Sequence, residues 1–271
     1  MKKIHVQVAG VPVQLYEINS PSAGTTNDRT ERRQLPVLFL HGAGSTGRVW
    51  TMQMRELSGY GRMLALDLPG FAGAGREAFE SLSDFPPFVC RVLDALGIEA
   101  AVWVGNSLGG RISLEAALDL PERVLGLGLV CSAGVRLPDV QVASPHEVTR
   151  EEFERRLFYR PERFTTAQTE QSRRATLQAR AYYDELVHRT AVLNFQPRLG
   201  EVRVPTSVIW GRHDGVIPLA IGEAFAEGIP NASWHVLEAS AHAPQVEEPH
   251  AVSDRLRRLL DEILLQGDSP A

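Results

Sequence analysis

Apolar runs of strand length alternate with amphipathic segments along most of the chain. The first two, "IHVQVAG" and "VPVQLYEI", alternate apolar and polar positions and are separated at Gly10, which predicts an antiparallel hairpin. The later runs are mostly apolar, as strands buried on both faces of a sheet are. They are "PVLFLHG", "MLALDLPG", "AVWVGNS", "VLGLGLVCSA", "TSVIWG" and "SWHVLE".

Segments with helical spacing lie between these runs. "SLSDFPPFVCRVLDALG" opens with the capping residue types Ser and Asp and ends in glycine, and "LGGRISLEAALDL" stops before Pro121. The closing segment "AVSDRLRRLLDEILL" has the apolar spacing of an amphipathic helix. Alternation of this kind predicts an α/β fold, with parallel strands joined by crossover helices.

The alternation stops near Gly134. From about Glu147 to Phe195 the chain is rich in Arg, Glu, Gln and aromatic residues and has no strand-like run, which predicts a helical insertion. We therefore divide the chain into an α/β core, residues 1–134 and 196–271, and a helical cap, residues 135–195. A polar stretch at residues 19–33 predicts a surface loop.

Length and composition fit this organisation and narrow the partners. A chain of 271 residues suits one large α/β domain, or one domain with an inserted lid, and 44% hydrophobic and 23% charged residues are ordinary for a soluble globular protein. The net charge of -5 argues against nucleic acid as the main partner, because phosphate binding needs a basic face. Two cysteines are too few for a disulfide framework, and the sequence has no Cys/His cluster typical of a structural metal.

The start "MKKIHVQVAG" has no long apolar stretch, and no segment has the length and hydrophobicity of a membrane span. We therefore expect a cytoplasmic protein that does not insert stably into membranes. The sequence leaves a homodimer open.

The stretch "GNSLG" connects a predicted strand to a predicted helix and fits the G-x-S-x-G nucleophile elbow. In such an elbow the chain crosses close to itself, so Gly105 and Gly109 would remove side chains that collide. Ser107 would be exposed at the start of the helix, whose amides and dipole favour a developing negative charge. The alternative is a glycine-rich turn with a structural serine.

A serine hydroxyl needs a base, and in this architecture an acid and then a histidine follow it in the chain. Asp214 comes just after the "TSVIWG" strand, and His242 lies between the last strand and the closing helix. Alone, Asp214 would be interpreted as a turn residue and His242 as a surface histidine. His213 is a rival base, but it precedes the acid. The three positions in the required order predict a catalytic triad.

An acyl-transfer site also needs donors for the oxyanion. The amide of Leu108, directly after the nucleophile, is one candidate, and the amide of Ala43 in "FLHGAGST" is the second. Gly42 would allow a tight loop there, and His41 would brace it. The alternative is a plain glycine turn.

At this point the chain resembles the α/β-hydrolase fold superfamily over nearly its whole length. The segments that carry the resemblance are "HGAG" at 41–44, "DLPGFAGAG" at 67–75, "GNSLGG" at 105–110, "GRHDGVIP" at 211–218 and "AHAPQVEEP" at 241–249. The resemblance implies a mostly parallel, eight-stranded sheet flanked by helices. It also implies a helical cap between the sixth strand and the strand that carries the acid. A serine mechanism with these residues and water needs no cofactor or metal, so we expect neither.

Within the superfamily, haloalkane dehalogenases and soluble epoxide hydrolases use an aspartate nucleophile, and Ser107 argues against both. "GNS" resembles the hydrolases that cleave carbon–carbon bonds in meta-ring-fission products. Those enzymes have an aromatic residue after the base, where this chain has Ala243, and a cap arginine, for which Arg189 is the candidate. Arg189 is equally well explained as a solvated helix charge. Asp67 fits a structural turn residue, and Cys131 a buried small hydrophobe.

We therefore predict a serine carboxylesterase that acts on small or medium acyl esters, with a small-molecule ester as its partner. A carbon–carbon hydrolase or a lactonase on the same site is the first alternative. A non-catalytic receptor for a small ligand on the same fold is the second.

Overall fold

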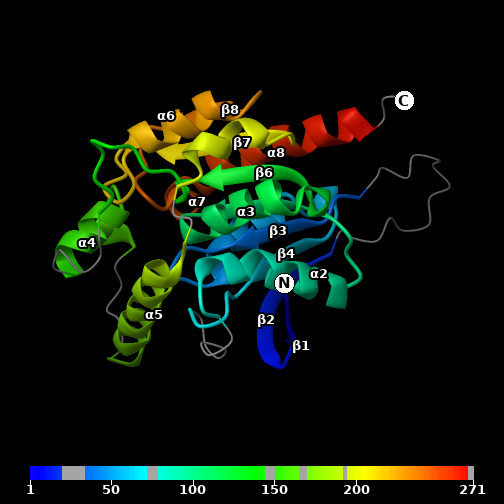
Figure 1. The fold of residues 1–271 in the computed structure, drawn as a ribbon, viewed down its shortest axis with the longest axis horizontal. Helices are drawn as coiled ribbons and strands as arrows, with labels where there is room; N and C mark the ends of the chain where they lie inside the picture. Colours follow the sequence, from blue (N-terminus) through cyan, green and yellow to red (C-terminus); the bar gives the residue numbers. More distant parts are fainter. Residues whose placement is uncertain (20–33, 72–78, 144–149, 165–169, 192–193, 268–271) are drawn as a thin grey trace.

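Eight strands form one sheet in the order β1-β2-β4-β3-β5-β6-β7-β8 (Figure 1). The computed structural model describes residues 1–19, 34–71, 79–143, 150–164, 170–191 and 194–267. The strands are β1 Lys2–Val8, β2 Val11–Ile18, β3 Val37–Leu40, β4 Met63–Leu66, β5 Ala101–Asn106, β6 Val124–Val130, β7 Thr206–Gly211 and β8 Ser233–Leu237. β2 runs antiparallel to both of its neighbours, and every other pair is parallel. The predicted fold class, a mostly parallel eight-stranded sheet, is confirmed.

The hairpin of β1 and β2 turns at Ala9 and Gly10, as the sequence predicts. Both residues have positive φ, 49° and 80°. Two consecutive left-handed residues match the right-handed twist of the flanking strands, which is why this type of turn is common in two-residue hairpins. The predicted loop at 19–33 lies outside the described residues apart from Asn19.

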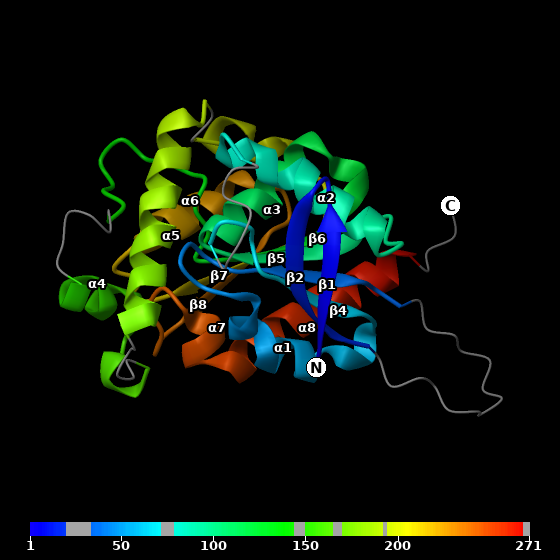
Figure 2. The same ribbon diagram turned by 90° about the horizontal axis from the view of Figure 1, so that it is seen from below.

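Alternate residues of each central strand point into two separate cores. In β3, Leu38 and Leu40 pack on one face of the sheet, whereas Val37 and Phe39 pack on the other. The first face is covered by α2 (Phe85–Ala95), α3 (Leu108–Asp119) and α6 (Leu219–Gly228), and the second by α1 (Thr51–Glu56) and α8 (Pro249–Gly267) (Figure 2). A sheet apolar on both faces has to be covered on both, which explains the continuous apolar runs.

The helix predicted from "SLSDFPPFVCRVLDALG" begins later in the structure than the sequence indicates. Residues Leu82–Asp84 form a 3-10 turn, and α2 begins only at Phe85. Ser81 and Asp84 form a capping box at this turn, and the two prolines that follow Phe85 lie in the first turn of α2, where a missing N–H is tolerated.

The cap lies between β6 and β7 and, in its described residues, contains helices and turns but no strand. Its helices are α4 (Arg150–Leu157) and α5 (Glu170–Arg189), which lie beyond the end of the sheet toward which β6 points (Figure 1). The N–H of Phe195 donates to the carbonyl of Gly134 at 2.7 Å, so the two ends of the cap are neighbours. Glu147, where the sequence places the start of the helical region, lies outside the described residues, and the boundaries at 134 and 196 remain predictions.

A helix must be both long and apolar to cross a lipid bilayer. Within the described ranges, no helix is both long enough and apolar enough to cross a lipid bilayer.

Candidate active site

Ser107 lies at a sharp turn between β5 and α3. Its backbone has φ 54° and ψ -115°, a strained conformation for a residue with a side chain. A Cβ on Gly105 would lie 2.2 Å from the backbone of Gly109, and a Cβ on Gly109 would lie 2.3 Å from the carbonyl oxygen of Leu40. Only glycine therefore fits at either position.

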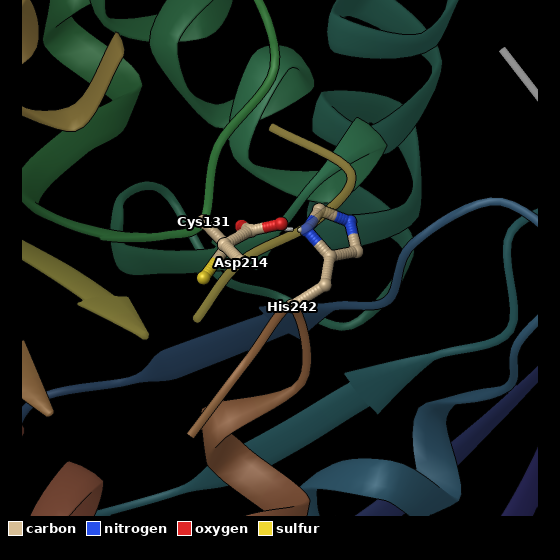
Figure 3. A group of neighbouring side chains, drawn as sticks. All are labelled: Cys131, Asp214 and His242. Atoms are coloured by element: carbon tan, nitrogen blue, oxygen red, sulfur yellow. Dashed lines mark hydrogen bonds and ion pairs between the residues drawn. The ribbon is translucent and has the colours of Figure 1, made fainter. Parts of the chain in front are cut away.

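Asp214 and His242 are paired and buried at the same end of the sheet (Figure 3). Nδ1 of His242 lies 2.8 Å from Oδ2 of Asp214. The other carboxylate oxygen, Oδ1, accepts hydrogen bonds from the N–H groups of Val216 and Ile217, both at 2.9 Å. The carboxylate is therefore fixed from one side and offers its second oxygen to the imidazole, which favours the tautomer with a proton on Nδ1.

The histidine loop is joined to the elbow through Asn106. Its side-chain amide donates to the carbonyl of His242 at 3.0 Å and to the carbonyl of Val130 at 3.1 Å. In the described part of the chain, the Ser107 hydroxyl and His242 make no hydrogen bond to each other. Such contacts are often long in the absence of substrate and shorten when it binds.

Two backbone N–H groups near the elbow have no hydrogen-bond partner among the described residues. Leu108 is the first residue of α3, so its N–H has no partner within the helix. The N–H of Ala43 donates to no other described residue, and the turn around it is closed by Gly44 at φ 78°. A Cβ on Gly42 would lie 3.2 Å from the Cβ of Ser107, which places this loop directly against the elbow.

The side chain of His41 is completely buried and contacts the same loop. Its Nδ1 lies 2.7 Å from the carbonyl of Gly42, and its Nε2 accepts from the N–H of Leu68 at 2.9 Å. One nitrogen must donate and the other accept, so the ring is neutral. Burial lowers its pKa, which favours the same state. His41 therefore connects the loop after β3 to the loop after β4.

Cys131 follows β6 and lies beside the His–Asp pair (Figure 3). Its thiol donates to the carbonyl of Ala241 at 3.6 Å and accepts from the N–H of Gly211 at 3.5 Å. Burial, with a smaller contribution from Asp214, raises its pKa well above the usual value, so the group is a neutral thiol and a poor nucleophile.

Ligand atoms of Cys131, Asp214 and His242 lie within 4.8 Å of one another, and these residue types can hold a metal ion. A metal there would require a thiolate, which the burial opposes. It would also displace the proton that Nδ1 of His242 shares with Asp214.

Three other residues considered in the sequence lie outside this arrangement. Asp67 accepts from the N–H of Gly47 at 2.7 Å and from the side chain of Gln14, which is a structural role. The exposed ring of His213 stacks on Tyr159. Arg189 has a side chain that is 56% exposed and forms an ion pair with Glu185 at 2.7 Å, so it is a solvated helix charge.

A cavity of about 90 Å³ lies between core and cap. It is lined by Leu82, Arg111, Ala133, Gly134, Val135, Arg136, Val142, Tyr183, Val187 and Ile217. The N–H groups of Ala133 and Arg111 donate to the carbonyl of Ser107, at 3.1 and 3.0 Å. Because Ile217 also donates to Asp214, the cavity adjoins both the elbow and the acid loop.

Arg111 is a residue of this cavity that sequence reasoning missed. It is buried, lies over the ring of Phe195 and pairs with Glu115 at 2.6 Å. Burial lowers its pKa. The spacing of Arg and Glu four residues apart in "GGRISLEAAL" is the signal that predicts such a pair.

The chain is similar in sequence to known hydrolases. A family model described as the alpha/beta hydrolase family matches residues 37–255. A 2-hydroxy-6-oxononadienedioate/2-hydroxy-6-oxononatrienedioate hydrolase of Paraburkholderia phymatum is 31% identical over 255 residues, which cover 85% of this chain and 87% of the relative. A pimeloyl-(acyl-carrier protein) methyl ester esterase of Aliivibrio salmonicida is 28% identical over 262 residues, which cover 88% of this chain and 97% of that one.

Among solved structures, a meta-cleavage product hydrolase from Pseudomonas fluorescens superposes with a TM-score of 0.73 at 21% identity, over 96% of this chain and 97% of that one. At this identity the likeness concerns the fold alone. The match to the family model covers most of the sheet, from β3 to beyond β8, together with the elbow and the loops of Asp214 and His242. The chain therefore belongs to the α/β hydrolase family.

Proposed function

We propose that the chain is a serine hydrolase that cleaves carboxylic esters of small or medium acyl groups through an acyl-enzyme. The single observation that carries the proposal is a strained serine at a strand-to-helix turn, at the same end of the sheet as a buried His–Asp pair. The esterase among the relatives is consistent with this chemistry.

In the proposed reaction, the hydroxyl oxygen of Ser107 attacks the acyl carbon while Nε2 of His242 accepts its proton. The tetrahedral intermediate collapses, and the imidazolium returns that proton to the leaving alkoxide. Water then attacks the acyl-enzyme with His242 again as base, releasing the acid and free Ser107. Asp214 keeps the proton on Nδ1 of His242 and stabilises the imidazolium.

The amides of Leu108 and Ala43 would receive the oxyanion. Their loops are fixed by α3 and by the bridge through His41, so little reorganisation is needed when the charge develops. The proposed steps use only these groups and water.

We further propose that the cap is a lid that sets substrate size. The cavity between Arg111 on α3 and Tyr183 on α5 would hold the part of the substrate next to the scissile bond. A cap over this space excludes water and strengthens the electrostatic interactions beneath it.

The test is turnover of p-nitrophenyl esters by Ser107→Ala, with covalent labelling by a small phosphonate. We expect kcat to fall on the order of a millionfold and labelling to disappear, with the fold intact by circular dichroism. Ser58→Ala, which removes an exposed hydroxyl, is the matched control and keeps full activity. Near-wild-type turnover by Ser107→Ala would refute the assignment.

A carbon–carbon hydrolase is the second candidate, favoured by the dienedioate hydrolase relative at 31% identity. The exposed, paired state of Arg189 gives it no role in holding a substrate carboxylate. Comparing kcat/KM for p-nitrophenyl esters, lactones and ring-fission dienoates distinguishes the candidates. Stoichiometric ligand binding without turnover would indicate a receptor.

A further inference from the structure

The C-terminal end of α4 contacts both loops that carry the acid and the base. The carbonyl of Leu157 accepts a hydrogen bond from the N–H of His242 at 3.0 Å. The carbonyl of Arg156 accepts one from the N–H of Gly215, next to Asp214, at 3.2 Å. Carbonyls at the end of a helix lack intrahelical partners, so the two triad loops provide them.

A single carboxylate connects the chain just after α4 to the histidine loop. Oε1 of Glu247, on α7 (Pro244–Glu247), accepts from the N–H of Tyr159 at 2.7 Å. Its Oε2 accepts from the N–H of Ala241, the residue before His242, also at 2.7 Å. Burial, with a smaller contribution from the charge of Glu248, raises the pKa of Glu247, whereas the backbone N–H groups of Ala241, Tyr159 and Arg160 act in the opposite direction.

Side chains also pack where the end of α4 meets the loops of Asp214 and His242. The ring of Tyr159 stacks on His213 with centroids 4.4 Å apart. A Cβ on Gly215 would lie 3.0 Å from Cα of Arg156, so α4 rests directly on the backbone of the acid loop. The position of this helix end and the positions of the two loops are therefore mutually dependent.

We propose that Glu247 is a positioning residue that couples the docking of α4 to the alignment of His242 with Asp214. This inference rests on the proposed function, in which His242 is the base. The histidine is held at its own N–H by Leu157, and the residue before it is held by Glu247. Loss of the carboxylate frees both contacts to shift, and a displacement of about 1 Å near a reacting group can lower a rate about 100-fold.

The test compares Glu247→Gln with Glu248→Gln. Gln keeps the shape of Glu247 but turns an N–H₂ group toward at least one of the backbone N–H donors of Tyr159, Ala241 and Arg160. Glu248→Gln loses the same charge one position away, and among the described residues the side chain of Glu248 accepts from Ala239 and Ser240 rather than from the chain after α4. The readouts are kcat and KM for a p-nitrophenyl ester, the inactivation rate with a small phosphonate, and hydrogen exchange at the amides of His242 and Gly215.

For Glu247→Gln we expect kcat and the phosphonate rate to fall together by about tenfold with KM unchanged, and both amides to exchange faster. Glu248→Gln should stay within about twofold of wild type in the rates, with exchange at the His242 amide unchanged. Gly215→Ala, which keeps the carboxylate but pushes Arg156 away, should reproduce the effect of Glu247→Gln. If Glu247→Gln does not fold, Gly215→Ala provides the test of the proposal.

The proposal is overturned if Glu247→Gln has wild-type rates and wild-type exchange at both amides. It is also overturned if a lower melting temperature is the only change in this variant. If the wild type neither turns over esters nor reacts with the phosphonate, the proposed function fails instead. The exchange at the two amides still reports the coupling in that case.

Discussion

The two oxygens of Asp214 have different partners, and this difference determines what an amide in their place would do. Oδ1 is held by the N–H groups of Val216 and Ile217, so only Oδ2 faces His242. In Asp214→Asn, the oxygen would stay with the two N–H donors and the N–H₂ group would face the ring. The ring would then adopt the wrong tautomer.

We therefore expect Asp214→Asn to remain folded and to lower kcat about 10⁴-fold. Steady-state kinetics with a p-nitrophenyl ester measures this, with the exposed Asp139→Asn as the control for loss of one charge. A loss of less than tenfold would exclude Asp214 as the acid.

His235 on β8 provides a prediction about stability and pH. Burial, followed by the charges of Arg255 and Arg258, lowers its pKa from 6.5 to about 4. Its neutral form is thus favoured by folding, so its contribution is complete above pH 6.5 and is lost as the pH falls from 6.5 toward 4. His235→Gln should therefore flatten the decrease in unfolding free energy between pH 6.5 and 4. Urea unfolding at several pH values tests this, and an unchanged slope would contradict it.

At the residue scale, the sequence suffices to propose the triad because each candidate belongs to a local motif and the chain order restricts the choice. Glu247 could not be assigned in the same way. Its partners Tyr159 and Ala241 come from segments that meet only in the folded chain. The tight contact between Gly215 and Arg156 is equally invisible, because the register of the cap helices is not encoded locally.

At the element scale, the elbow depends on the absence of side chains. A methyl group on Gly105 would lie 2.2 Å from backbone atoms of Gly109, and backbone cannot rotate away as a flexible side chain can. Overpacking of this kind typically costs about 1–3 kcal/mol and sometimes more.

We expect Gly105→Ala to be destabilised by about 3 kcal/mol or more and to lose phosphonate labelling, because α3 would have to move away from β5. Gly200→Ala is the matched control, since a Cβ there meets no atom within 4 Å, and it should be at least as stable as wild type. Chemical denaturation of both variants tests this. If Gly105→Ala were as stable as wild type, the backbone at Gly105 and Gly109 would be able to move apart without cost.

Elements with strong periodicity could be predicted, and weakly patterned ones could not. The bounds agree with the predicted segments within two residues for β3, β5, β7, β8 and α3. β4 ends four residues and β6 three residues before the end of the predicted segment. The helices α1 and α6 were not predicted. α1 is only six residues long and follows a 3-10 turn. α6 contains Gly222, a poor helix former that is needed because a Cβ there would lie 2.6 Å from the rings of Trp210 and Trp234.

At the scale of the whole molecule, residues of the core and of the cap together line one cavity. The sequence shows a cap segment rich in aromatic residues, but these residues occupy different positions in the structure. Tyr183 lines the cavity, whereas Tyr182 packs against Phe71 and Gly70. Tyr159 is 41% exposed and stacks on His213. The hydrophobic pattern could not separate these roles, because adjacent tyrosines on one helix differ only in the direction in which they point.

Tyr183→Ala should therefore change chain-length preference, because removal of its ring extends the cavity between Arg111 and Val187. Each additional methylene that fits into an apolar pocket is worth about tenfold or more in kcat/KM. We expect the ratio of kcat/KM for p-nitrophenyl octanoate over butyrate to rise at least tenfold, with labelling by a small phosphonate unchanged. Tyr159→Ala, which removes the same ring outside the cavity, should scale all esters equally and keep the wild-type ratio. An unchanged ratio in Tyr183→Ala would show that the acyl chain does not occupy this cavity, and the lid would have to set substrate size through other residues.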